Sequence, residues 1–207
     1  MTARSPVWTG PLAVVLVFAG LIATGAGLLR ATGILPLPVA HGPRSVPAAF
    51  PVLTESRPTR IAIPAIHVRA PVFPVGLAAD GSIVAPPLQR HNEAGWYDGG
   101  PTPGEFGPAI IVGHVDTRTG PSVFHDLRRL HPGATVEVTR RDGRVAVFRV
   151  DSVEQFGKDG LPADRVYGDF SRPTLRLITC GGRWVSGAGA YADNIVVFAS
   201  LTGTRAG

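Results

Sequence analysis

From residue 61 onward, apolar residues occur in short runs that alternate with polar residues and end at Gly, Pro, Asn or Asp. Alternation with a period of two is typical of half-buried β-strands. The clearest example is a hairpin made of residues 134–140 and 144–156, which the turn Arg141-Asp142-Gly143 joins. About eight such runs predict a mainly β fold, either a barrel or a sandwich.

The remaining predicted strands show the same pattern, in which runs rich in β-branched residues are bounded by turn residues. They are residues 61–68, 70–76, 81–87, 108–114, 174–180 and 194–201. Only residues 122–131 show helical spacing, with Val123, Leu127 and Leu130 on one face. We expect a short helix there.

The N-terminal part of the chain has a different pattern. Residues 12–29 form an uncharged apolar run of 18 residues, which as a helix spans roughly 27 Å, close to the thickness of a bilayer core. We therefore expect a short cytoplasmic N-terminus (1–11), a transmembrane anchor (12–30), a proline-rich spacer (31–60) and an extracytoplasmic domain (61–207). The alternative is a signal peptide, which would also export the domain.

Charge and cysteine content reduce the number of function classes that fit the chain. Lys and Arg outnumber Asp and Glu by 20 to 15, but the basic residues are scattered and match no nucleic-acid-binding motif, so no nucleic-acid partner is expected. Cys180 is the only cysteine, which excludes an internal disulfide, and no spacing of Cys and His predicts a metal site or cofactor. A lone thiol in an exported protein is exposed to oxidation, which favours a catalytic role.

Cys180 ends an apolar run and precedes two glycines, so backbone amides can approach a group that the sulfur attacks. The alternative is that Cys180 is a small buried apolar residue. A nucleophilic thiol needs a basic partner, and His114, at the end of the run 108–114, is the candidate, although a structural histidine fits the spacing equally well. Asp116 either orients His114 or terminates the strand as a turn residue.

Two segments together carry a resemblance to a known family. GPAIIVGHVD (107–116) and TLRLITCGG (174–182) closely resemble the signature segments of bacterial sortases. GWYDGGPTPGEFGP (95–108) is similar to the segment that precedes the histidine in the class E and class F branches. YADNIVVFA (191–199) is most like class F.

The resemblance implies a closed eight-stranded β-barrel with short helices. It also implies that Cys180 attacks the threonine carbonyl of a C-terminal LPxTG-like sorting signal and forms a thioester, which an amine of a cell-wall precursor or pilin resolves. His114 would move the protons. The implied partners are secreted proteins that bear such signals, the amine acceptor, and the membrane through the N-terminal helix; no cofactor is implied.

The arginine of the family does not carry over, because its usual position is Asn194 in this chain. Arg183, three residues after Cys180, is the nearest substitute for stabilising an oxyanion, and Asn194 is a weaker donor. Thr179 belongs to the family's TLxTC pattern and is a candidate substrate contact. Arg90, Arg118 and Arg176 are further candidates for this role from other parts of the chain.

Two other functions remain open on sequence grounds. One is an exported thiol hydrolase that uses water as the acceptor. The other is a catalytically impaired β-barrel binding module, which the missing arginine favours. Trp96 and Tyr97 are predicted to be packing residues.

Overall fold

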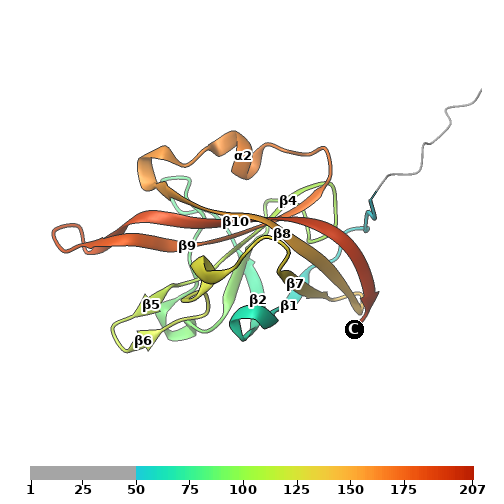
Figure 1. The fold of residues 1–207 in the computed structure, drawn as a ribbon, viewed down its shortest axis with the longest axis horizontal. Coiled ribbons are helices and arrows are strands. Elements are labelled where there is room, and N and C mark those ends of the chain that lie inside the picture. The colour runs from blue at the N-terminus through green and yellow to red at the C-terminus, as the bar shows by residue number, and fades with distance from the viewer. Residues whose placement is uncertain (1–49) are drawn as a thin grey trace, which may run out of the picture. The chain divides into compact units, whose positions relative to one another are not determined.

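The computed structural model describes residues 50–207, which form a closed barrel with the strand order β1-β2-β3-β4-β9-β10-β8-β7 (Figure 1). The strands are β1 (Pro58–Ile63), β2 (Val68–Val75), β3 (Ala94–Tyr97), β4 (Gly107–Val112), β7 (Thr135–Arg140), β8 (Arg144–Gly157), β9 (Pro173–Val185) and β10 (Ala190–Ala206). Strands β5 (Asp116–Thr117) and β6 (Gly120–Pro121) form a separate two-stranded sheet. The prediction of a mainly β, closed eight-stranded barrel is confirmed.

The helices of the described region are short. They are α2 (Ala163–Tyr167) and the 3-10 helices η1 (Pro64–Ile66), η2 (Leu88–Arg90), η3 (Leu127–Arg129) and η4 (Lys158–Gly160). Within residues 50–207, no helix combines the length and the hydropathy that crossing a membrane requires. The predicted cytoplasmic N-terminus and transmembrane anchor, and most of the spacer, lie outside the described residues.

Alternation along the strands fills the barrel. On β9, Leu175 and Leu177 are fully buried in the main core, while Arg176 and Ile178 face the other side of the sheet, towards α2. This is the period of two that a strand dictates. Residues of β9 therefore present their side chains in turn to the inside and the outside of the barrel. The consecutive residues Thr179 and Cys180 consequently point to opposite sides of the sheet.

The predicted hairpin is confirmed, with β7 and β8 paired antiparallel from Thr139↔Val145 to Thr135↔Arg149. Trp96 is buried as predicted, and its indole nitrogen donates to the carbonyl of Pro101 at 3.1 Å. The barrel also contains two parallel pairs, β2 with β3 and β4 with β9. The second of these pairs positions the candidate active site.

Two local predictions are wrong, and one element was not predicted. Residues 122–131 form no α-helix, because the backbone makes i to i−3 bonds there, such as Leu127 N–H to Phe124 O at 3.1 Å, and only η3 is regular. The apolar side chains of this segment are nevertheless buried, as the spacing predicted. Residues 81–87 form no strand but a single bridge, Leu77↔Ile83, and α2 was not predicted.

The chain just before β1 packs against the barrel. Leu53 is buried, and its backbone amide donates to Gly104 O at 2.8 Å. β1 begins at Pro58, before the expected boundary at residue 61. Residues 50–57, which were assigned to the spacer, therefore belong to the folded unit.

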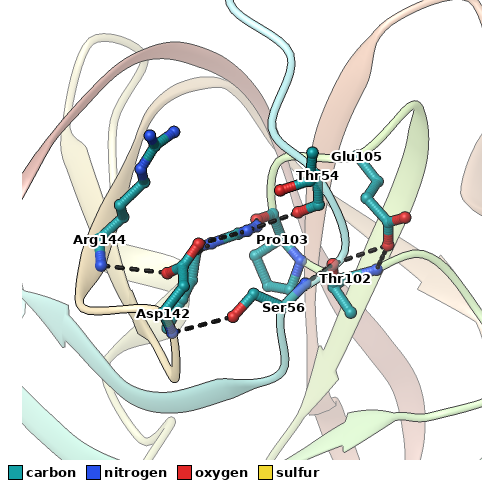
Figure 2. A network of polar contacts seen from close by, with 8 residues as sticks. Thr54, Ser56, Thr102, Pro103, Glu105, Asp142 and Arg144 are labelled. Atoms are coloured by element: carbon teal, nitrogen blue, oxygen red, sulfur yellow. Dashed lines mark hydrogen bonds and ion pairs between the residues drawn. The ribbon is translucent and has the colours of Figure 1, made fainter.

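A buried arginine fixes this segment (Figure 2). The guanidinium of Arg140 is fully buried and donates to the carbonyls of Pro103 and Thr54, the latter at 2.5 Å, and to Asp142 Oδ2 at 2.9 Å. The hydrogen bond from Arg140 holds the pKa of Asp142 below its ordinary value of 3.8. A buried charge is tolerated at this place because carbonyls and a carboxylate accept its protons.

Candidate active site

Cys180 lies inside β9 rather than at its end, which corrects the sequence prediction. It pairs with Asn194 of β10, and β9 continues to Val185, so that the hairpin of β9 and β10 extends beyond the barrel (Figure 1). Pairing resumes beyond Gly182 after a shift in register between Tyr191 and Asp193. Gly182 fits at this irregularity because it has a φ of +75° and an added Cβ would lie 2.0 Å from Asp193 Oδ2. The glycines thus bend the ladder beside Cys180 instead of ending it.

The parallel pairing of β4 and β9 brings His114 to Cys180. The last paired positions are Val112 and Ile178, and the amide of Gly113 still donates to Ile178 O at 3.1 Å. Two residues further along each chain are His114 and Cys180. His114 therefore lies two residues beyond β4, not at its end, and lines the same cavity as Cys180.

Gly113 allows this approach. An added Cβ would lie 2.6 Å from Val123 Cγ1 and 2.7 Å from Phe124 Cδ2, so only glycine lets residues 122–124 pack here. The amide of Phe124 then donates to His114 O at 2.9 Å, which fixes the backbone of the histidine.

The imidazole of His114 is oriented by a backbone carbonyl. Its Nε2 lies 2.6 Å from Pro86 O, and since a carbonyl only accepts, Nε2 carries the proton. Nδ1 is then the nitrogen at which a proton can be added or removed. The side chain is half-buried.

Two cavities meet at Cys180. The larger, of about 790 Å³, is lined by His114, Cys180 and apolar side chains that include Leu88 and Trp184. The smaller, of about 290 Å³, is lined by Thr179 of β9, Ile195 of β10 and Arg128 of η3, among others. Below we refer to them as the donor groove and the polar cavity.

The cavities share the edge of β9 that β4 leaves open after Val112. Val115, Asp116, Cys180 and Tyr191 line both of them. Tyr191 donates its hydroxyl proton to Asp116 Oδ2 between the two spaces, and this hydrogen bond, with burial, raises the pKa of Tyr191. Asp116 is therefore bonded to Tyr191 in this structure, while His114 is bonded to Pro86.

The predicted supporting residues occupy different places. Thr179 is 4% exposed, lines the polar cavity, and has a hydroxyl without a hydrogen-bond partner. Asn194 lies beside Cys180 on β10 but lines neither cavity. Arg183 is exposed on the hairpin and also lines neither.

Two other arginines share a cavity with Cys180. Arg118 lines the donor groove, and Arg128, which was not among the predicted arginines, lines the polar cavity. Arg176 is buried, its pKa is lowered by burial, and it donates to Arg165 O beneath α2. Arg90 pairs with Glu93.

Among residues 50–207, no group of three His, Cys, Asp or Glu side chains is arranged to hold a metal ion. The chemistry available at the meeting point of the cavities is thus that of a thiol, an imidazole with a free Nδ1 and a hydrogen-bonded Tyr-Asp pair. A thiol beside a histidine is the arrangement that nucleophilic acyl transfer needs.

A family model for the sortase domain matches residues 61–202, which is more than half of the chain. This chain belongs to the sortase family. Members of the family are cysteine transpeptidases. Among curated proteins, no sequence matches the chain significantly.

Solved sortases have the same fold at low sequence identity. A lid mutant of sortase A from Corynebacterium diphtheriae has a TM-score of 0.56 at 18% identity and covers 72% of this chain and 73% of its own. The pilus-related sortase C of Group B Streptococcus has a TM-score of 0.55 at 16% identity, with 73% and 70% covered. Sortase C-1 from Actinomyces oris has a TM-score of 0.54 at 21% identity, with 70% and 73% covered.

Proposed function

We propose that this sortase cleaves a C-terminal LPxTG-like sorting signal between Thr and Gly and transfers the acyl group to an amine of a cell-wall precursor or pilin. The observation that carries the proposal is that Cys180 and His114, from two segments of the chain, line one groove. A groove of about 790 Å³ lies in the range of pockets that hold an extended peptide segment or a drug-sized ligand.

The first half-reaction starts from the thiolate of Cys180 and the imidazolium of His114. The sulfur attacks the threonine carbonyl carbon, and an S–C bond forms. The C–N bond to glycine then breaks, and the leaving amine takes the proton from Nδ1 of His114. The products are a thioester, a neutral imidazole and a free glycine amine.

In the second half-reaction an unprotonated amine attacks the thioester carbonyl. A C–N bond forms, the surplus proton of the amine passes to His114, and the sulfur leaves as thiolate. The enzyme returns to its starting charge state. Pro86 supports both steps, because its carbonyl holds Nε2–H and so leaves Nδ1 as the nitrogen that exchanges the proton.

The walls of the donor groove suit the apolar part of a sorting signal. Leu88 and Trp184 are 60% and 51% exposed, which is high for large apolar side chains, and both line the groove. Burial of the leucine and proline of the signal against them would contribute about 25 cal/mol per Å² of apolar surface removed from water.

Two finer assignments belong to the same proposal. The segments 95–108 and 191–199 favour the class E and F branch, most closely class F. The uncharged run 12–29 favours a single-pass membrane anchor with the catalytic domain outside the cytoplasm. Pilins are included among the acceptors because one neighbour in fold is described as pilus-related.

The test is to incubate the protein with a fluorescent LPxTG-containing peptide and look for the protein-peptide thioester by intact-mass spectrometry. We expect the adduct in the natural protein and none in Cys180→Ala, which should unfold at a similar temperature. An alanine variant that still cleaves the peptide would contradict the proposal. Addition of an amine should yield a peptide-amine product, whereas a thiol hydrolase would release only the free acid.

A further inference from the structure

The charged side chains of the polar cavity and of its surroundings differ in whether they have a partner. Its lining includes one cation, the exposed guanidinium of Arg128, and within residues 50–207 no carboxylate pairs with this arginine. The neighbouring Arg129, in contrast, pairs with Asp126 at 3.2 Å and does not line the cavity. Arg128 is therefore available for an anionic ligand.

The acidic groups beside the cavity are already occupied. Asp116 accepts the proton of Tyr191, and Asp193 Oδ2 accepts from Gln155 Nε2 at 2.6 Å. Each of these carboxylates thus accepts a hydrogen bond from a neutral donor. Among the charged Asp and Arg side chains of the cavity and its border, only Arg128 lacks a side-chain partner within residues 50–207.

Thr179 supplies the second, independent observation. Three buried side-chain atoms of the described region lack a hydrogen-bond partner, and they belong to Arg172, Thr174 and Thr179. Only Thr179 lines a cavity at Cys180. An unpartnered buried hydroxyl is destabilising by about 1–3 kcal/mol, and a ligand oxygen would remove this penalty.

We propose that the polar cavity binds the acceptor of the transfer reaction, and that this acceptor is an amine that also carries a carboxylate. Arg128 and Thr179 bind the carboxylate, and the amine projects to the meeting point of the cavities at Cys180. This inference rests on the proposed function and specifies its second substrate.

The lining of the two cavities divides the two substrates between them. His114 lines only the donor groove, and Thr179 and Arg128 line only the polar cavity. An acyl group held in the groove thus leaves the polar cavity open to an incoming molecule of small size. The amine attacks the thioester carbon and passes its proton to His114 across the open edge, while the thiolate of Cys180 departs.

The experiment uses matched acceptors that differ only in a carboxylate: glycine against glycinamide, and 6-aminohexanoate against 6-aminohexanamide. Product formation from an LPxTG-containing peptide is followed by chromatography at equal concentrations of unprotonated amine. We expect at least one carboxylate form to be preferred by about 10- to 100-fold in kcat/KM, as a charge-assisted hydrogen bond implies. Arg128→Gln should abolish the preference, and Arg129→Gln, which removes the same charge from the same helix, should keep it.

Thioester formation without added amine separates this inference from the proposed function. It should be equal in the natural protein and Arg128→Gln, because Arg128 does not line the donor groove. Equal use of both members of each acceptor pair, a preference that survives Arg128→Gln, loss of the preference in Arg129→Gln, or a thioester that only water resolves would each overturn the acceptor site. Failure to form any thioester would instead overturn the proposed function, and the acceptor site with it.

Discussion

Buried polar side chains at the two ends of the long strand β8 differ in their hydrogen bonding. At its start, beside Arg144, the guanidinium of Arg140 is buried and shares its protons among two carbonyls and a carboxylate. At its other end, β8 pairs with Asn194, which also pairs with Cys180. Within residues 50–207, the hydroxyl of Thr179 is buried there without a hydrogen-bond partner, and no carboxylate pairs with Arg128.

We infer that the polar contacts at the Arg140 end stabilise the fold, whereas the polar groups at the Cys180 end serve to bind a ligand. The Arg140 contacts join residues 54, 103 and 142, which are distant in sequence, and each nitrogen of the guanidinium donates to an acceptor within residues 50–207. The Cys180 end keeps donors without acceptors next to open space, which is the arrangement expected where a ligand completes the hydrogen bonding. Substitutions at the first end should change stability, and those at the second should change reaction rates.

The largest effect is expected for His114→Ala. Loss of proton transfer should lower kcat/KM for the complete reaction by about 10²- to 10⁴-fold, measured with an LPxTG-containing peptide. The unfolding free energy should change by only about 1 kcal/mol, because one hydrogen bond to Pro86 is lost. A rate within threefold of the natural protein would refute the role of His114.

Arg140→Met should have the reverse effect. Asp142 and the carbonyls of Thr54 and Pro103 lose their donor, so urea unfolding should show a loss of about 3–5 kcal/mol. Activity per folded molecule should stay unchanged. Arg144→Met is the matched control, because that side chain is exposed, and it should shift stability by less than about 0.5 kcal/mol.

Thr179→Val sharpens the comparison further, because it removes the unpartnered hydroxyl. The unfolding free energy should rise by about 1 kcal/mol, while transfer to the carboxylate-bearing acceptor should fall several-fold. Thr174→Val removes an equally buried hydroxyl of β9 that lies away from both cavities. It should stabilise similarly and leave transfer unchanged; a matching loss of transfer would show that the effect is not local.

The smallest effect concerns pH. The pKa of Asp142 is lowered in the folded state by Arg140, so its contribution to stability is present above the ordinary value of 3.8 and is lost as pH falls through the lower folded pKa. The difference in unfolding free energy between the natural protein and Asp142→Asn should therefore shrink as pH drops below about 4. In an Arg140→Met background this pH dependence should become weaker, because the smaller effect of Arg144 on the pKa of Asp142 remains; an unchanged pH dependence would mean that Arg140 is not the main cause.

Much of the barrel follows from local pattern. The hairpin of β7 and β8 and the inward positions of β9 were predictable, because alternation decides which side chains a sheet buries. Residues 122–131 were misassigned for a related reason: the spacing of Val123, Leu127 and Leu130 identifies buried side chains but does not distinguish an α-helix from 3-10 turns. The strand β3 and the bent continuation of β9 depend on pairing with distant strands, which no local pattern contains.

The sequence by itself determined the family and the presence of a single thiol, because short segments carry the residue types that identify the sortase domain, and it predicts His114 as the partner of Cys180. It did not determine which arginine shares a cavity with Cys180. Arg183 is near Cys180 in the chain but exposed on the hairpin, whereas Arg128, which is 52 positions away, lines the polar cavity together with it. Only the tertiary structure decided this, because β4 pairs with β9 only as far as Val112, and the residues that follow line two cavities that share Cys180.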